Sequence, residues 1–309
     1  MKTHKPKVLI LMSTYNGENF LFQQLESIQC QKDVEIEILV RDDGSKDNTL
    51  NILKDFNDKF NILRIYKEDN IGSARSFMRL ISIACSLNKV YDFYAFSDQD
   101  DIWLPTKIIR AINCLSSMKK ELSLIYCGSP KLVDEKLNPM PSKEINLNGT
   151  FGESMIINRA LGCTEVFNEN LLRLINRYEP KFLMMHDAWV YRVCLATGGH
   201  IYYDKQKYIL YRQHSQNVVG GRSNIYLRWK RRINAYLSNY KNVRLKTAEN
   251  LFYGYESYLT SENKEILYLI LNYRRSFKDK IALISNKALK TNSKEHNIIF
   301  KIAVIMGIY

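Results

Sequence analysis

The chain has 309 residues, of which 46% are hydrophobic and 25% are charged, a composition typical of an ordinary soluble protein. This length allows one large domain or two smaller ones. The six cysteines form no Cys-x-x-Cys pair, which argues against a zinc site or a disulfide framework and fits a reducing compartment. No window reaches ~18 apolar residues, so we expect no transmembrane helix.

The net charge of +13 is unevenly distributed along the chain. Residues 1–218 hold 28 basic and 26 acidic side chains, whereas residues 219–309 hold 17 basic and 6 acidic ones. We therefore predict a nearly neutral domain over 1–218 and a basic, mainly helical extension over 219–309. A basic extension indicates an anionic partner, either nucleic acid or a phospholipid surface. Because no nucleic-acid-binding motif accompanies the charge, we expect no nucleic acid.

Short apolar runs alternate with helical periodicity in the first part of the chain. The wholly apolar run Val8–Met12 predicts a strand buried on both faces. Further strands are expected at Glu35–Val40, Ile62–Tyr66, Tyr91–Phe96 and Leu122–Cys127, with helices at Phe20–Ile28, from about Asn48, at Ser73–Leu87 and at Lys107–Met118. This alternation predicts an α/β fold, with a parallel sheet covered by helices on both faces. Ligands bind beyond the carboxyl ends of the strands in such sheets.

The second part of the chain is less regular. Residues 128–150 hold three of the six prolines and predict a loop or hairpin. Helices are expected at Asn168–Arg177 and from His186 to Thr197, followed by a closing pair of strands at Ile201–Tyr203 and Tyr208–Tyr211. A basic amphipathic helix is predicted around Tyr226–Tyr240, and a second helix at about Ser261–Phe277.

Three carboxylates stand directly behind the Tyr91–Phe96 strand, at Asp98, Asp100 and Asp101. Two Asp residues separated by one position at a strand end can share one hard divalent cation. We expect Asp100 to be the direct ligand and Asp98 to assist it. Asp101 has three interpretations, as either of these or as the N-cap of a helix ahead of Trp103. An alternative for the whole stretch is a solvated acidic turn.

Four motifs, each at a predicted strand end, resemble those of inverting glycosyltransferases of family 2, which have the GT-A fold. They are Thr14-Tyr15-Asn16, Asp42-Asp43-Gly44-Ser45, Asn70-Ile71-Gly72 and Asp98-Gln99-Asp100-Asp101. The resemblance covers about residues 6–218 and implies a mixed, mostly parallel sheet and a nucleotide-sugar donor. It implies that Tyr15 stacks on the donor base, that Asp43 accepts the base N–H, and that Arg75 lies near the diphosphate. The implied donor site also includes Thr14, Asn16, Glu18 and Asp42.

The resemblance also assigns the metal and the acceptor side of the site. Asp98 and Asp100 match the family's D-x-D motif, which implies Mn²⁺ or Mg²⁺, with Asp98 also contacting the donor. Tyr211-Arg212-Gln213-His214 implies a diphosphate contact from Arg212 and a metal ligand in His214, although a lone histidine can also be structural. Asp187, within Met185-His186-Asp187-Ala188-Trp189, is the implied general base, with a plain helix cap as its alternative. His186 is expected to orient Asp187 or to line the acceptor cleft. Trp189 is assigned to the substrate cleft, and Gly162-Cys163-Thr164 to the loop beneath the acceptor.

The form of the acidic motif narrows the resemblance further. Phe-Ser-Asp-Gln-Asp-Asp-Ile-Trp-Leu-Pro, together with the late Tyr-Arg-Gln-His, is similar to bacterial rhamnosyltransferases that build cell-surface polysaccharides from dTDP-rhamnose. A UDP-hexose donor stays open, as do a sugar nucleotidyltransferase and a non-catalytic binding protein on the same fold. The implied acceptor is a glycan or a lipid-linked glycan. We therefore expect a cytoplasmic protein, peripheral at the inner face of the cell membrane, whose basic extension contacts anionic lipid or simply packs on the catalytic domain.

Overall fold

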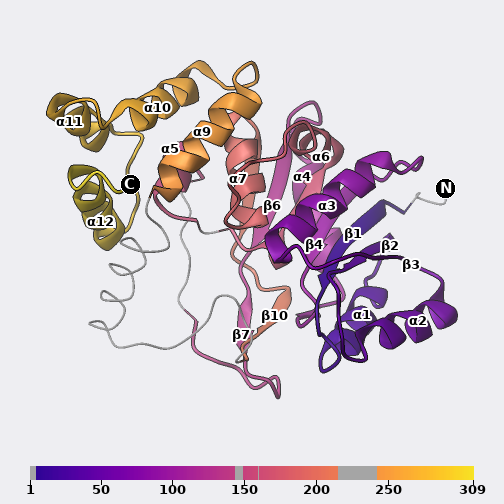
Figure 1. The fold of residues 1–309 in the computed structure, drawn as a ribbon. Coiled ribbons are helices and arrows are strands. Elements are labelled where there is room, and N and C mark those ends of the chain that lie inside the picture. The colour runs from indigo at the N-terminus through magenta and orange to yellow at the C-terminus, as the bar shows by residue number, and fades with distance from the viewer. Residues whose placement is uncertain (1–4, 143–148, 159, 215–241) are drawn as a thin grey trace.

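The computed structural model describes residues 5–142, 149–158, 160–214 and 242–309 (Figure 1). Within them, a seven-stranded sheet has the order β3-β2-β1-β4-β8-β6-β9. Its strands are β1 (Lys7–Thr14), β2 (Glu35–Asp42), β3 (Leu63–Lys67), β4 (Phe93–Ser97), β6 (Leu124–Gly128), β8 (Val166–Asn168) and β9 (His200–Asp204). β8 runs antiparallel to β4 and β6, while the other neighbours are parallel. The prediction of a mixed, mostly parallel sheet is confirmed.

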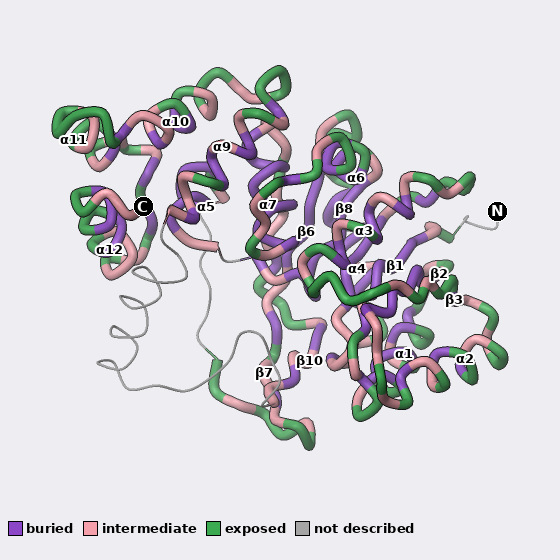
Figure 2. The backbone as a smooth tube through the Cα atoms, viewed as in Figure 1, coloured by how far each residue is buried: buried purple, intermediate pink, exposed green. Residues whose placement is uncertain are grey.

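Helices cover both faces of this sheet. They are α1 (Leu21–Gln29), α2 (Thr49–Phe60), α3 (Ser73–Ser86), α4 (Lys107–Ser116), α5 (Phe151–Ile156), α6 (Glu169–Ile175) and α7 (His186–Ala196). The strand β1 shows why two layers are needed, because its side chains alternate between two separate cores. Val8, Ile10 and Met12 pack with residues of α1, α2 and α4, whereas Leu9 and Leu11 pack with residues of α3, α6 and α7. Figure 2 shows buried residues running through the central strands.

A second, small sheet corrects one sequence prediction. It consists of β5 (Ile102–Trp103), β10 (Ile209–Arg212) and β7 (Lys131–Val133), in that order. β9 and β10 were expected to pair with each other, but β9 adds to the main sheet beside β6, and β10 lies between β5 and β7. Strand periodicity does not encode the partner, which depends on segments far apart in the chain. The short elements β8 and α5 were not predicted.

The described part of the extension is helical, as expected. It contains α9 (Val243–Tyr255), α10 (Ser261–Asn272), α11 (Phe277–Ser285) and α12 (Lys294–Ile305). The predicted helix Ser261–Phe277 is interrupted, because Ser276 caps a new helix by accepting from the Asp279 N–H at 3.1 Å. The predicted amphipathic helix at Tyr226–Tyr240 and the proposed boundary at residue 218 lie outside the described residues. None of the helices in the described ranges is long and apolar enough to cross a membrane.

The C-terminal helices share one hydrophobic core with the α/β body. Every residue of α7 is buried, which requires cover on the side away from the sheet. Figure 1 shows α9 lying across α7, and Leu251 and Tyr255 of α9 belong to the same core cluster as Trp189 of α7. Residues of α10, α11 and α12 belong to the same cluster, so these four helices pack on the α/β body. These helices support the helix that begins with His186 and Asp187. The packing alternative for Tyr226–Tyr240 lies outside the described residues.

We predict that Tyr309→Phe lowers the free energy of unfolding by about 1 kcal/mol. Tyr309 is fully buried, and its hydroxyl donates to the Met155 carbonyl of α5 at 2.8 Å. Urea unfolding measures the change. Tyr268→Phe on α10 is the matched control because the Tyr268 side chain is exposed. Equal unfolding midpoints for the wild type and Tyr309→Phe would show that this contact does not hold the extension in place.

Candidate active site

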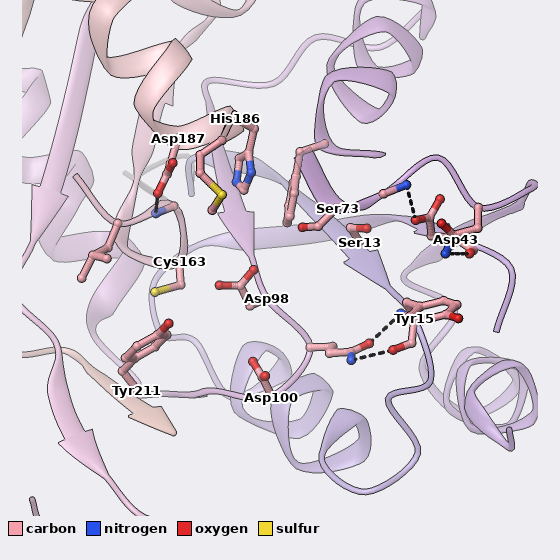
Figure 3. A pocket seen from close by; sticks show the side chains of 17 residues that line it. Ser13, Tyr15, Asp43, Ser73, Asp98, Asp100, Cys163, His186, Asp187 and Tyr211 are labelled. Carbon is pink, nitrogen blue, oxygen red and sulfur yellow. Dashed lines mark hydrogen bonds between the residues drawn. The ribbon is translucent and has the colours of Figure 1, made fainter. Parts of the chain in front are cut away.

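A cavity of about 400 Å³ opens at the carboxyl ends of β1, β2 and β4, beside the first turns of α3 and α7 (Figure 3). Eight of the residues expected from the sequence line it: Tyr15, Asp43, Asp98, Asp100, Gly162, Cys163, His186 and Asp187. Their positions follow from the topology, since parallel strands bring their carboxyl ends to one edge of the sheet. The cavity therefore collects residues from five separate motifs.

Two expected donor-site residues turn inward instead. Thr14 and Asp42 are fully buried, and the Thr14 hydroxyl donates to Asp42 Oδ2 at 2.9 Å. Asp42 also accepts from the backbone N–H of Ser45 at 2.9 Å and from its hydroxyl at 2.5 Å. Neither residue lines the cavity. The hydrogen bonds of Thr14 and Asp42 hold the loop after β2 in place. Because successive strand residues face opposite sides, Asp43 faces the cavity while Asp42 does not.

Asp43 is held in place by a residue that the sequence did not single out. It accepts from the backbone N–H of Ile71 at 2.8 Å and from that of Gly72 at 3.0 Å. The guanidinium of Arg41 also donates to it, and Arg41 is 1% exposed. Arg41 is therefore committed to structure. An arginine at the end of an otherwise apolar strand was the available signal, since a buried guanidinium needs carboxylate partners.

The loop after β1 places the Tyr15 ring at the rim of the cavity, where it is 47% exposed. The Tyr15 N–H donates to Gln99 Oε1 at 2.8 Å, and Gln99 Nε2 donates to the Tyr15 carbonyl at 3.0 Å. Asn16 and Glu18 face the start of α2, where they accept from the N–H groups of Lys46 and Asn48 at 2.9 and 3.0 Å. Asn16 and Glu18 brace the loop and do not line the cavity.

The acidic stretch forms the floor of the cavity. Figure 3 shows Asp98 between Asp187 and Asp100. Burial raises the pKa of Asp98 to about 7, with repulsion from Asp100 and Asp187 adding to it. Asp101 is fully buried beneath, and its Oδ2 has no hydrogen-bond partner among the described residues. Burial is also the main cause that raises the pKa of Asp101 well above its usual range. These convergent carboxylates are a costly arrangement unless a cation joins them.

The N-cap interpretation of Asp101 is wrong. Ile102 and Trp103 form β5, and α4 begins at Lys107 with Thr106 in the N-cap position. Asp101 Oδ1 instead accepts from the Arg212 backbone N–H at 3.3 Å. This contact ties the acidic stretch to β10.

The late motif reaches the acidic stretch from the other side. His214 Nε2 lies 2.8 Å from Asp100 Oδ2. The Arg212 guanidinium is buried and donates to the Asp100 carbonyl at 2.9 Å and to Gln23 Oε1 at 2.7 Å. Arg212 thus shapes the loop around Asp100 and does not line the cavity. The sequence predicted that Arg212 and His214 both belong to the site, but it did not show which of them has a structural role and which a chemical one.

The chemistry of this donor set fits a hard divalent cation. Among the described residues, ligand atoms of Asp98, Asp101 and Cys163 all lie within 4.8 Å of one another. Asp100 and His214, which the sequence placed among the metal ligands, are not in this group and contact each other at 2.8 Å. Carboxylate oxygens with one imidazole suit Mn²⁺ or Mg²⁺. The partnerless oxygen of Asp101 and the mutual repulsion of the carboxylates are what a bound cation relieves.

The first turn of α7 forms the opposite wall. Asp187 Oδ2 accepts from the Gly162 N–H at 3.2 Å, and Oδ1 accepts from the Ala188 N–H at 2.5 Å. Burial raises the pKa of Asp187, and the two backbone bonds partly offset this rise. The result is a buried carboxylate with a strengthened affinity for a proton, which suits a general base.

His186 is a cavity wall and does not orient Asp187. Its ring stacks on Phe77 with centroids 3.8 Å apart, and neither ring nitrogen has a hydrogen-bond partner in the described part of the chain. Burial lowers the pKa of His186 to about 3, so the imidazole is neutral. Gly162 is needed beside it, because a Cβ there would lie 2.7 Å from His186 Nε2. The two ring nitrogens are buried, and Nε2 faces Gly162.

Three further expected contacts lie elsewhere. Trp189 is buried between Tyr178 and Tyr255, since on a helix it points about 200° away from Asp187. The Thr164 hydroxyl donates to the Leu161 carbonyl at 2.8 Å. Arg75 is half exposed on α3 and lies 3.5 Å from Glu179. None of the three lines the cavity.

Other residues of the cavity and its floor were not assigned from the sequence. The remaining lining residues are Ser13, Asn70, Gly72, Ser73, Phe77, Gln99, Leu161, Met185 and Tyr211. Most of them neighbour a motif residue, and that was the available signal. Lys107 is buried below the floor with its Nζ 3.4 Å from the centroid of the Trp103 ring, and burial lowers its pKa to about 7.

Comparison with solved structures gives the type of fold. The chain is similar to S. aureus TarS 1–349, with a TM-score of 0.59 and 16% identity over 98% of this chain and 81% of that one. It is also similar to the mannosyltransferase PcManGT from Pyrobaculum calidifontis, with a TM-score of 0.51 and 14% identity over 99% and 82% of the two chains. The likeness and the mixed sheet show a fold of the GT-A type.

Sequence comparison then gives the family. Residues 9–192 match the family described as glycosyl transferase family 2. The dTDP-rhamnosyl transferase RfbG of Shigella flexneri is 33% identical over 234 residues, which are 71% of this chain and 77% of RfbG. The beta-1,3-glucosyltransferase WfgD of Escherichia coli is 26% identical over 62% of this chain and 71% of its own. The chain belongs to glycosyl transferase family 2 and is a glycosyltransferase, which removes the nucleotidyltransferase and non-catalytic alternatives.

Proposed function

We propose that this enzyme transfers rhamnose from dTDP-rhamnose, with inversion, to a hydroxyl of a glycan or lipid-linked glycan in surface polysaccharide synthesis. One observation carries the proposal. A single cavity has Tyr15 and Asp43 at one end, Asp98 and Asp100 on its floor, and Asp187 on the opposite wall. This order suits a nucleotide base, a diphosphate and an acceptor hydroxyl in sequence.

In the proposed reaction, Asp187 takes the proton from the acceptor hydroxyl as that oxygen attacks the anomeric carbon. The bond from this carbon to the diphosphate oxygen breaks, and the nucleoside diphosphate leaves. Attack from the face opposite the leaving group inverts the configuration. Asp98, Asp100 and His214 would hold Mn²⁺ or Mg²⁺, which supplies positive charge against the leaving diphosphate.

The donor assignment is supported by RfbG, a dTDP-rhamnosyl transferase that is 33% identical over 71% of this chain and 77% of its own. A UDP-hexose donor is the second candidate, because WfgD is named as using UDP-Glc. The two candidates share the cavity and its carboxylates. They differ only in the base and the sugar that the cavity accepts.

A donor panel tests this proposal. The enzyme is incubated with Mn²⁺ and with dTDP-rhamnose, UDP-glucose and UDP-N-acetylglucosamine, and nucleoside diphosphate release is measured with and without undecaprenyl-diphosphate-linked acceptors. We expect dTDP-rhamnose to be the preferred donor. Turnover of a UDP-sugar with no turnover of dTDP-rhamnose would overturn the rhamnose assignment and retain the glycosyltransferase. Loss of release on adding EDTA, restored by excess Mn²⁺, is the expected metal dependence.

We further propose that the enzyme lies in the cytoplasm, peripheral to the inner face of the membrane, where its basic extension contacts anionic lipid. The support is the charge of residues 219–309, with 17 basic and 6 acidic side chains. Part of the described extension also has exposed apolar residues, among them Phe277 of α11 and Ile302 and Met306 of α12.

Vesicle sedimentation tests this contact. Vesicles containing phosphatidylglycerol should retain the enzyme at low salt and release most of it at high salt. Ile302→Asp should weaken the retention, whereas Tyr253→Asp, on an exposed position of α9, should not. Retention that is equal on neutral and anionic vesicles would remove the electrostatic part of the proposal.

A further inference from the structure

We propose that Gln99, which stands between Asp98 and Asp100 in the acidic motif, is a positioning residue. It sets the distance between Tyr15, the proposed stacking partner of the donor base, and the two carboxylates proposed to bind the metal. Its side-chain amide pairs with both backbone groups of Tyr15, at 2.8 Å to the N–H and 3.0 Å to the carbonyl. We call this pairing the Gln99 clamp. The inference rests on the proposed function, because it concerns how that site holds a nucleoside diphosphate.

The Gln99 clamp joins two loops that are 84 positions apart in the chain. One loop follows β1 and carries Tyr15, the other follows β4 and carries Asp98, Gln99 and Asp100, and all four residues line the cavity. Each side-chain bond is made to the backbone, so the clamp fixes the path of the loop and leaves the Tyr15 ring free to meet a base. A nucleoside diphosphate that spans the two loops then binds loops whose separation is already fixed. Less conformational entropy is therefore lost on binding.

Gly17 shows how closely the two loops approach. A Cβ at this position would lie 2.4 Å from Gln99 Oε1 and 2.6 Å from Gln99 Cδ. Gly17 does not have a positive φ, so its backbone conformation does not itself require glycine. The lack of a side chain at Gly17 therefore makes room for the Gln99 amide. Alanine at this position would displace the amide while leaving Gln99 and its neighbours chemically unchanged.

This geometry permits a double-mutant test. Gln99→Ala removes the amide, and Gly17→Ala displaces it, so each single variant opens the same clamp. We expect each to raise the donor KM and the Kd for dTDP with Mn²⁺ about tenfold, as the loss of two hydrogen bonds to one loop predicts. The kcat at saturating donor should change less than twofold, because the carboxylates remain. The double variant should bind no worse than either single one. Gln29→Ala, at an exposed position near the end of α1, is the control and should match the wild type.

Hydrogen exchange of the Tyr15 amide, measured without any nucleotide, gives a readout that does not depend on the donor. We expect exchange to be about tenfold faster in Gln99→Ala and in Gly17→Ala and unchanged in Gln29→Ala. If the wild type binds neither dTDP nor UDP with Mn²⁺, the proposed function fails, and the exchange result still decides whether the clamp exists. Unchanged Tyr15 exchange in both variants, or affinity losses that add in the double variant, would overturn the inference. So would a fall in kcat and melting temperature at constant Kd, which indicates a purely structural role.

Discussion

Asp187→Asn should lower kcat by about 10²–10⁴-fold, because it removes the group that takes the acceptor proton. Asn keeps the shape of the side chain, and its single oxygen can accept from one of the two N–H groups, Gly162 or Ala188, that now bond to separate carboxylate oxygens. The loss of the other bond costs about 1 kcal/mol. We therefore expect a melting temperature within a few degrees of the wild type and an unchanged Kd for dTDP with Mn²⁺. Transfer to the acceptor, followed by nucleoside diphosphate release, measures kcat. Activity within threefold of the wild type would exclude Asp187 as the base.

The pH profile is a second measurement on the same residue. A base must be ionised to act, so activity should fall as the pH drops through the pKa of Asp187. Burial raises this pKa, so the acidic limb should lie above the ordinary range of an aspartate. Saturating Mn²⁺ is used throughout, so that the carboxylates of the acidic stretch stay occupied. The Asn variant should lose the limb along with the activity. A limb at the ordinary aspartate pKa would contradict the effect of burial.

Asp100→Ala should lower transfer at least 10²-fold, since the leaving diphosphate loses the charge that a cation supplies against it. Asp100 is the carboxylate that meets His214 and lies beside Asp98. We also expect Mn²⁺ affinity, measured by titration calorimetry or by electron paramagnetic resonance, to fall by at least tenfold. The backbone carbonyl of residue 100 still accepts from Arg212 in this variant, so the loop should keep its path.

Asp134→Ala is the matched control for Asp100→Ala, because Asp134 lies in the turn after β7 and bonds only within that turn, to Lys136, Leu137 and Asn138. It should leave both transfer and Mn²⁺ affinity unchanged. If Asp100→Ala binds Mn²⁺ as the wild type does and still loses activity, the carboxylate contacts the donor and is not a metal ligand. If activity also persists, the D-x-D assignment itself is wrong.

The sequence predicted the site best where the chemistry was local. Asp98 and Asp100 come just after β4, and Asp187 lies in the first turn of α7, so periodicity placed them at strand or helix ends and the topology rule put those ends together. The wholly apolar run Val8–Met12 likewise required helices on both faces, and both layers are present. Motif spacing could not show which role each residue within a motif has. Asp42 and Asp43 are adjacent, yet one is fully buried and the other lines the cavity.

By itself, the sequence determined the family, the order of the main elements and the carboxylates of the cavity, because these depend on local pattern and on the ends of strands. Only the tertiary structure decided which residues are committed to support. Arg41, Arg212 and Gln99 each have a partner that is distant in the chain, which for Arg41 is Glu68 and the Asp69 carbonyl. The pairing of β10 with β5 and β7, and the cover that α9 gives to α7, are set in the same way. A partner that lies far along the chain leaves no trace in the local spacing of residues, and the folded backbone is what brings the two together.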